Sequence, residues 1–337
     1  MKDTVFRPRY YCWIRPLPWF LALLLLFASC ERRELTYYME AEITVTADWS
    51  RAGVPEEKDD GVTLVIFPQD GSEPRVILTG ERERTIVRLP RGTYDAILFN
   101  RSFTDFSNLL FTGMESLKSL EAYAKEVVTR ADTRVIVSSP DKLASGTVRN
   151  FEVTDDMLGN YAPPAARGVC PEGACRMHFT PTPLTRHIRV TLNVKGLHNI
   201  REVRCTLDGV PLSVFLHDGH AGEELGGQQF TVGNPVFAEG SFTDGHLTGE
   251  LDVFGFDRSL SHSIALKALL VDGKTVVEQT LTGITVEEET DSAGNIMLYI
   301  DASAPEVFPD VKPEGGSDSG FDVDVDEWED EEVDIPV

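Results

Sequence analysis

The side chains in this sequence that could act in catalysis or bind a metal are seven histidines and five cysteines. The closest pair of histidines is in His217-Asp-Gly-His220, where two imidazoles and a carboxylate could hold a metal ion. An Asp-Gly step more often marks the tip of a turn, so we favour a turn and expect no metal and no other cofactor. The histidines are not grouped with a nucleophile, and the sequence lacks Gly-x-Ser-x-Gly, His-Glu-x-x-His and phosphate-binding glycine loops. We therefore expect no catalytic residues and no enzymatic activity.

Two of the cysteines enclose a short loop, Cys170-Pro-Glu-Gly-Ala-Cys175. Disulfides are characteristic of exported proteins, so we predict a disulfide between Cys170 and Cys175, with a pair of free thiols as the alternative. A zinc site that also used His178 would lack a fourth ligand, and the spacing matches no common zinc finger. Cys205 lies in an alternating apolar run and is predicted to be a small core residue.

The first 30 residues have the pattern of a bacterial export signal. Basic side chains precede an apolar run at residues 19–27, which is shorter than the roughly 20 residues that span a bilayer. The run ends in Phe27-Ala-Ser-Cys30, which resembles a lipobox, although leucine is more usual than phenylalanine at its first position. The resemblance implies cleavage before Cys30, diacylglycerol on its sulfur and an acyl chain on its new amino group. Several acyl chains would hold the mature protein stably on a membrane.

The end of the chain is strongly acidic. Residues 306–337 hold 13 acidic side chains and one basic one, and apolar residues alternate with Asp322, Asp324 and Asp326. A calcium-binding loop is disfavoured because Glu327 and Val333 stand where such a loop needs glycine and glutamate. The remaining alternatives are a solvated tail and an amphipathic strand that adds to an exposed sheet edge. The contact residues of such a strand would be Phe321, Val323, Val325 and Trp328.

The composition points to a folded β protein that does not bind nucleic acid. The formal net charge is −24, so a phosphate backbone would be repelled rather than neutralised. Hydrophobic residues make up 42% of the chain, which is enough to bury cores, and 337 residues suit two domains better than one.

Short apolar or alternating segments between turn residues predict an all-β fold with two tandem β-sandwiches. In the first half, the expected strands are 43–49, 62–67, 75–78, 85–89, 93–99 and 135–137. In the second half, they are 185–194, 203–207, 212–216, 229–232, 246–254, 264–271, 275–282 and 296–300. Asp272-Gly273 lies between two of these runs and is the strongest hairpin signal. One helix is expected over 115–126, where Leu117 and Leu120 recur at helical spacing.

These segments divide the chain into five expected parts. The parts are a lipoprotein signal peptide at 1–29, an N-terminal β-sandwich at 30–139, a linker or long loop at 140–177, a C-terminal β-sandwich at 178–304 and an acidic tail with an amphipathic strand at 305–337. Within the linker, which is rich in turn residues, a short strand at 147–153 is the one regular element considered.

Several segments together resemble a known family. They are 41–49, 62–71, 89–100, 207–214 and 320–328, the last beginning Gly-Phe-Asp-Val-Asp and ending in Glu-Trp. They resemble Bacteroidota lipoproteins that form a family of unassigned function, which is similar to the FimB/Mfa-type anchor subunits of fimbriae. The resemblance implies two transthyretin-like, Greek-key sandwiches at the outer membrane, on its cell-surface or periplasmic side. It also implies fimbrial or other surface proteins as partners, because fimbrial subunits of this type lend a strand to the next subunit.

Two functions follow from these features. The first is a non-enzymatic surface lipoprotein, of fimbrial anchor or adhesin type, that acts through β-strand addition. The alternative is a lipoprotein that binds a glycan or a host protein, which would need exposed aromatic side chains on loops. The nearest candidates are Phe103, Phe106 and Phe111, which we expect instead to pack inside the fold.

Overall fold

The computed structural model describes residues 37–54, 61–127, 135–160, 175–290 and 296–314. The strands described below all lie in the compact unit Glu40–Val337. Within the described ranges, no helix has the length and apolar character to cross a membrane. Cys30, Cys170 and the predicted tail strand lie outside these ranges.

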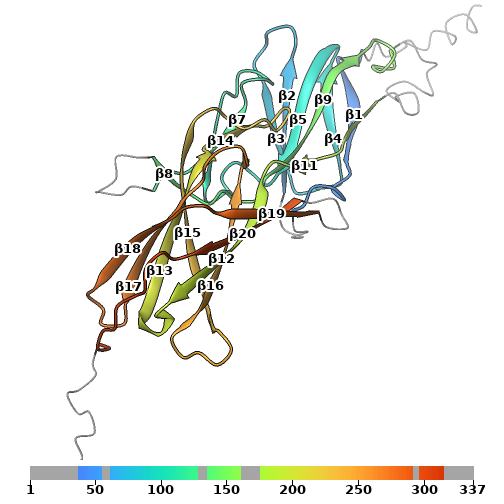
Figure 1. Ribbon diagram of the computed structural model, residues 1–337. Helices are drawn as coiled ribbons and strands as arrows, with labels where there is room; N and C mark the ends of the chain where they lie inside the picture. Colours follow the sequence, from blue (N-terminus) through green and yellow to red (C-terminus); the bar gives the residue numbers. More distant parts are fainter. Residues whose placement is uncertain (1–36, 55–60, 128–134, 161–174, 291–295, 315–337) are drawn as a thin grey trace, which may run out of the picture. The chain divides into compact units, whose positions relative to one another are not determined.

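The described strands form four sheets (Figure 1). Sheet A has the order β10 (Arg176–Phe179), β1 (Glu40–Ala47) and β4 (Arg84–Pro90). Sheet B has the order β11 (Thr182–Pro183), β9 (Ala144–Val153), β5 (Gly92–Asn100), β2 (Val62–Pro68) and β3 (Arg75–Thr79). Sheet C has the order β14 (Ser213–Phe215), β7 (Glu121–Ala124) and β6 (Leu109–Thr112). Sheet D has the order β18 (Val276–Leu281), β17 (Ile264–Leu270), β13 (Ile200–Pro211), β15 (Leu225–Phe237), β16 (Asp244–Val253), β12 (Arg186–Lys195), β20 (Ile296–Ser303) and β19 (Thr285–Thr290), and β8 (Ile136–Ser138) pairs with β15.

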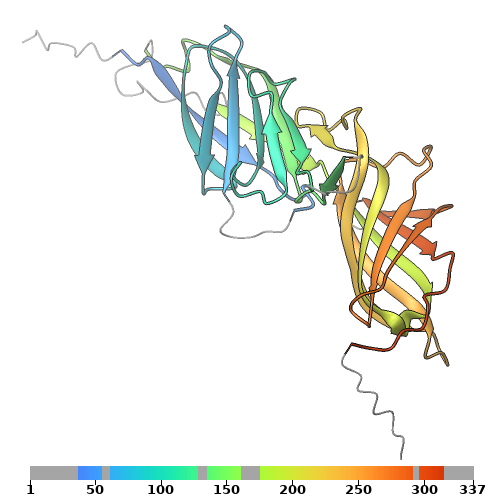
Figure 2. The ribbon, with the colours of Figure 1, turned by 90° about the vertical axis from the view of Figure 1, so that its left-hand side faces the viewer.

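Sheet B is covered on both faces (Figure 2). On one face, Leu64 of β2 shares a buried core with Ile43 of β1 in sheet A. On the other face, Val65 of β2 and Phe99 of β5 share a second core with side chains of sheet C, such as Ala122. Because both faces are covered, every residue of β2 except the last is buried, and its sequence is apolar except for Thr63 rather than alternating.

Sheet D surrounds a third core. In β12 the buried positions alternate with exposed or half-buried ones, so Ile188, Val190 and Leu192 face the core. Past β20, the chain returns across this core and buries Phe308, whose backbone N–H donates to the carbonyl of Lys195 at 2.9 Å. The prediction of an all-β protein with sandwich-like sheets is therefore confirmed.

Strand pairing crosses the predicted domain boundaries. Strand β8, expected to close the N-terminal sandwich, pairs in parallel with β15 of sheet D. Strand β14, expected in the C-terminal sandwich, pairs with β7 of sheet C. Strand β9 lies inside the range predicted as a linker and pairs along much of its length with β5. The common reason is packing, since Val137 of β8 and Val214 of β14 are buried in the same core over sheet B.

The helix predicted over 115–126 is wrong. Residues 114–119 form turns and a bend, and β7 begins at Glu121. The turns are held by Ser119, whose hydroxyl donates to the carbonyl of Gly113 at 2.8 Å. Leu117 and Leu120 are buried at the spacing that suggested a helix, but Leu117 lies in a turn and Leu120 directly precedes β7. Local periodicity alone could not distinguish the two arrangements.

The hairpin predicted at Asp272-Gly273 is confirmed. It joins β17 and β18, which pair antiparallel. Gly273 has a φ of +67°, which a side chain would disfavour, and the Asp272 carboxylate accepts hydrogen bonds from the N–H groups of Lys274 and Thr275.

The buried side chain of His262 contacts the loop after β16 in sheet D. The ring nitrogens of His262 lie 3.0 Å from the carbonyl oxygen of Asp208 and 2.8 Å from that of Asp257. The ring also stacks on Phe256 with centroids 4.0 Å apart. The side chain therefore links the loop after β16 to β13 by two polar contacts and one ring contact.

Replacing His262 with alanine should lower the free energy of unfolding by about 2–4 kcal/mol, because the backbone carbonyls of Asp208 and Asp257 lose their contacts with the ring and a cavity opens beside Phe256. Urea unfolding followed by circular dichroism would measure the change. The matched control is His198→Ala, since His198 is partly exposed and contacts only the exposed Asp310 among the ion pairs found. It should change stability by less than about 1 kcal/mol. Equal midpoints for the two variants would contradict the prediction.

Candidate functional site

Exposed sheet edges are the parts of a β protein that can bind another chain through the backbone. In sheet D, one edge is β19, which carries three consecutive exposed glutamates at 287–289. The other edge is β18, where the side-chain amide of Gln279 exchanges hydrogen bonds with the backbone of Glu306 at 3.1 and 3.2 Å. The negative charges of β19 disfavour pairing with another strand, and the segment that contains Glu306 covers part of β18.

The edge formed by β3 and β4 is different. Strand β3 ends sheet B and β4 ends sheet A, and the two are consecutive in the chain. They are bridged by the Arg75 guanidinium, which donates to the backbone carbonyl of Arg88 at 2.9 Å. Both strands of the edge carry exposed apolar side chains. These are Val76 (44% exposed), Leu78 (59%) and Ile86 (57%). We call this region the β3–β4 edge.

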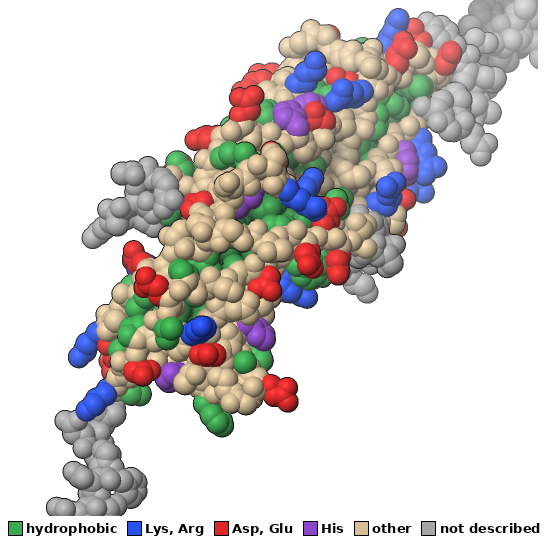
Figure 3. Space-filling view, viewed as in Figure 1, with side chains coloured by type: hydrophobic (Ala, Val, Ile, Leu, Met, Phe, Trp, Pro, Cys, Tyr) green, Lys and Arg blue, Asp and Glu red, His purple; other side chains and the backbone are tan. Residues whose placement is uncertain are grey.

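The β3–β4 edge is also locally basic. Residues 75–91 contain five arginines and two glutamates, in a chain whose net charge is −24. Two of these arginines already pair with exposed carboxylates, Arg88 with Glu42 at 2.7 Å and Arg91 with Asp155 at 2.8 Å, which leaves a smaller positive excess. On the face drawn in Figure 3, acidic and basic side chains are interspersed. An acidic segment would therefore be attracted to this edge, most strongly at low ionic strength.

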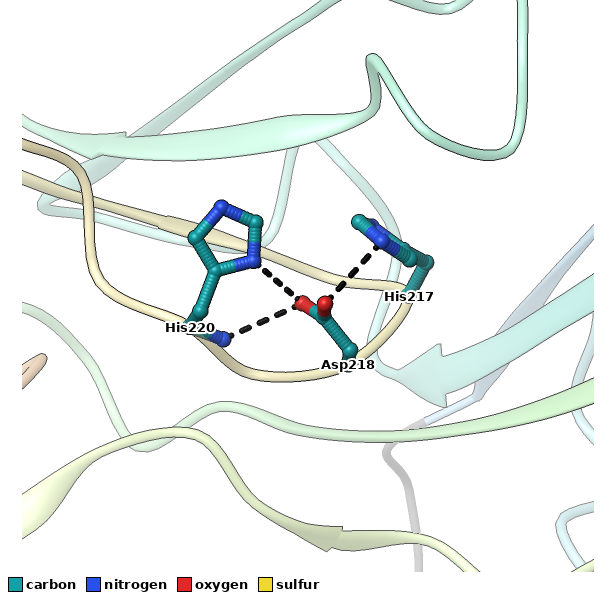
Figure 4. Close-up of side chains that lie close together, drawn as sticks. All are labelled: His217, Asp218 and His220. Atoms are coloured by element: carbon teal, nitrogen blue, oxygen red, sulfur yellow. Dashed lines mark hydrogen bonds and ion pairs between the residues drawn. The ribbon is translucent and has the colours of Figure 1, made fainter.

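The predicted turn at His217-Asp-Gly-His220 brings its polar side chains together (Figure 4). Nε2 of His217 lies 3.1 Å from one oxygen of Asp218, and Nδ1 of His220 lies 2.6 Å from the other. Burial lowers the pKa of His217. Burial acts to raise the pKa of Asp218, but hydrogen bonds from His220 and the charges of both histidines hold it below its ordinary value. At neutral pH the turn therefore presents an ionised carboxylate between two imidazoles.

Two cysteines lie in the described ranges, and their states differ. Cys175 is disulfide-bonded, and its partner lies outside those ranges. The pairing of Cys170 with Cys175 therefore stays a prediction. Cys205 is a free thiol in the core of sheet D, and burial raises its pKa to about 12. Its predicted role as a small core residue agrees with this position.

A thiol count tests the predicted pairing. We expect the secreted, lipidated protein to show one free thiol when unfolded without reductant, because only Cys205 is unpaired, and three after reduction. Alkylation followed by mass spectrometry would measure both numbers. A Cys170→Ser variant should gain a second alkylated site at Cys175, and three thiols without reduction would contradict the pairing.

The aromatic residues considered for glycan binding lie within the fold. Phe106 is 3% exposed and belongs to the core between sheets B and C. Phe103 and Phe111 are partly buried against the same core, and their rings contact Phe99 at centroid distances of 5.0 and 5.4 Å. These side chains therefore pack as predicted and do not form an exposed aromatic platform.

Sequence reasoning found the histidine turn but missed the β3–β4 edge. The strands β3 and β4 were predicted, but strand order depends on distant pairing and cannot be read from a local pattern. The one available signal was the cluster of arginines around exposed apolar positions. The other predicted site residues, Cys30, Phe321, Val323, Val325 and Trp328, lie outside the described residues.

Comparison with known proteins identifies the family to which the chain belongs. Its fold is that of an all-β protein with sandwich-like sheets, and residues 29–230 match the model of a domain of unknown function, DUF5119. The chain belongs to this family, which confirms the resemblance predicted from the sequence segments.

Two individual relatives are informative. The chain is 26% identical over 193 residues to a candidate fimbrium anchoring subunit, Fim4B of Bacteroides ovatus, covering 56% of this chain and 52% of that protein. It thus spans about half the length of this curated relative. A crystal structure of a candidate adhesin from Bacteroides ovatus aligns with a TM-score of 0.54 at 18% identity, covering 75% of this chain and 86% of that one. The second comparison supports the fold.

Proposed function

We propose that this protein is a non-enzymatic lipoprotein of the outer membrane that serves as a fimbrial anchor or assembly subunit, or as a related adhesin. The observation that carries the proposal is the similarity to the fimbrium anchoring subunit Fim4B. The lipobox supports it, since Cys30 lies at the start of the residues that match the family. Lipid on Cys30 would hold the base of a fibre at the membrane, and the sandwich-like sheets would carry the contacts to other subunits.

The contact itself is β-strand addition at the β3–β4 edge. The donor would be the tail strand of a neighbouring subunit, in which Phe321, Val323 and Val325 alternate with aspartates. An added strand places alternate side chains on opposite faces of a sheet. Its apolar face would cover the exposed Val76 and Leu78, and its acidic face would approach the arginines.

Purification of the lipidated protein from cross-linked native outer membranes tests the proposed function. We expect fimbrial subunits to co-purify with the wild-type protein in near-stoichiometric amounts. They should be lost from a variant that lacks residues 320–337. Recovery of the same partners with and without these residues would refute the role of the tail. Recovery of no surface-fibre protein at all would refute the fimbrial role.

A further inference from the structure

The turn that carries His217, Asp218 and His220 is the one group of three potential metal ligands found in the part of the chain that the structure describes. It lies after β14, away from the strands to which the proposed function assigns a role. One ligand atom from each of the three side chains lies within 4.8 Å of the others. Ligand atoms around a tetrahedral ion with bonds of about 2.0–2.2 Å are about 3.3–3.6 Å apart, so binding requires the three side chains to move closer together by rotation.

The backbone fixes the turn before any ligand arrives. The N–H of Gly219 donates to the carbonyl of Phe215 at 2.9 Å, and the N–H of Phe215 donates to the carbonyl of His220 at 2.9 Å. Gly219 has a φ of +74°, and a Cβ there would also come within 3.0 Å of Leu184. A residue other than glycine is therefore disfavoured at the position that turns the chain between the ligands.

Two side chains of the neighbouring strand β9 donate hydrogen bonds to the backbone of the same turn. The hydroxyl of Ser145 donates to the carbonyl of Leu216 at 2.7 Å, and the hydroxyl of Thr147 donates to the carbonyl of His217 at 3.2 Å. Phe215 stacks against the ring of His220 with centroids 4.3 Å apart. Contacts with β9 and Phe215 thus restrain both histidines, so that binding an ion requires little reordering of the backbone.

The hydrogen bonds of the turn leave one ligand unsatisfied. Nδ1 of His217 is buried and has no hydrogen-bond partner among the residues that the structure describes. If His217 donates from Nε2 to Asp218, the lone pair on Nδ1 has no donor. If the proton is on Nδ1, the lone pair on Nε2 faces a carboxylate oxygen at 3.1 Å. A cation bound between Nε2 and the carboxylate would remove the repulsion in the second case, in which Nε2 is free to act as a ligand. The buried Nδ1–H would keep no acceptor among the described residues with or without the ion.

We propose that His217, Asp218 and His220 bind one divalent transition-metal ion of the zinc type. Two imidazoles and one carboxylate suit zinc and its neighbours better than calcium or magnesium, which prefer all-oxygen sites. Three protein ligands leave at least one coordination position for water or for a side chain of another molecule. Arg149 and Lys118 are the basic side chains near His217, and their charges make the site weaker than a buried structural site.

Isothermal titration calorimetry of the full-length protein, purified without a histidine tag, tests this proposal with ZnCl₂ as the probe. We expect one ion per chain, and no comparable heat with MgCl₂ or CaCl₂. His220→Gln should weaken Zn²⁺ binding by at least about 10- to 100-fold, because loss of even an outer-shell partner of a metal ligand has an effect of that size. Co²⁺ in place of Zn²⁺ should give visible absorption bands that disappear in the same variant.

The matched control is His198→Gln, which removes a surface histidine that also contacts a carboxylate, at 3.2 Å, but has no second histidine in its group. It should leave Zn²⁺ affinity unchanged. Circular dichroism and urea unfolding would show that His220→Gln is folded. Absence of Zn²⁺ binding by the wild-type protein would overturn the proposal, as would equal affinities of the wild type and the folded His220→Gln variant.

Discussion

Replacing Cys30 with alanine is expected to release the protein from the membrane completely and to abolish incorporation of labelled palmitate. The reason is that the lipobox thiol is the predicted acceptor of diacylglycerol, and lipidation contributes about 0.8 kcal/mol per buried CH₂. Outside the predicted signal peptide, no apolar segment of the sequence approaches the length of a membrane span. The acyl chains on Cys30 are therefore the expected attachment to the membrane. Metabolic labelling with palmitate, followed by membrane fractionation, measures both effects in the same culture.

The matched control for this experiment is Cys12→Ala. Cys12 lies in the same predicted signal peptide but precedes the apolar run, so its loss should change neither labelling nor fractionation. A wild-type protein that incorporates no more palmitate than the Cys30→Ala variant would contradict lipidation. The protein would then be proposed as an unanchored exported protein, and its place at the base of a fibre would need another attachment.

Strands with clear local signals were predicted from the sequence. The strands β1, β2, β4 and β5 have apolar positions bounded by turn residues, and they were found close to the expected ranges. Strand β19 was missed because its sequence, Thr-Val-Glu-Glu-Glu-Thr, buries no residue fully and shows no alternation. Among the described strands it pairs with β20 alone and forms an edge, so its charges protect it from other chains rather than define a core.

The sheets to which strands belong were harder to predict than the strands. Strand β8 was expected to end one domain, but it pairs with β15, and its Val137 is buried in the core over sheet B. Strand β14 joins sheet C for the same reason, through Val214. Local sequence indicates that these segments are apolar and extended, whereas their partners are set by long-range packing. The same limit explains why the histidine turn was predicted and the β3–β4 edge was not.

The β3–β4 edge is the basis of the second prediction. A peptide of residues 318–330 should bind to a chain that ends at residue 317, and the double substitution Val76→Glu and Leu78→Glu should weaken that binding at least about tenfold. The substitutions remove two apolar cross-strand contacts and place acidic side chains opposite an acidic strand. Both side chains are exposed, at 44% and 59%, so the fold should tolerate the change. Fluorescence anisotropy of the labelled peptide would measure the affinities.

A control on an edge strand of sheet D distinguishes strand addition at the β3–β4 edge from general attraction or repulsion of charge. Val276→Glu places an acidic side chain on β18, another edge strand, at a valine that is 48% exposed. If the peptide adds to β3, this variant should bind as tightly as the parent chain, and rising salt should weaken binding to both because the donor is acidic and the edge is basic. Equal weakening by the β3 and β18 variants would contradict addition at the β3–β4 edge, because electrostatic repulsion by the whole chain would then account for the loss.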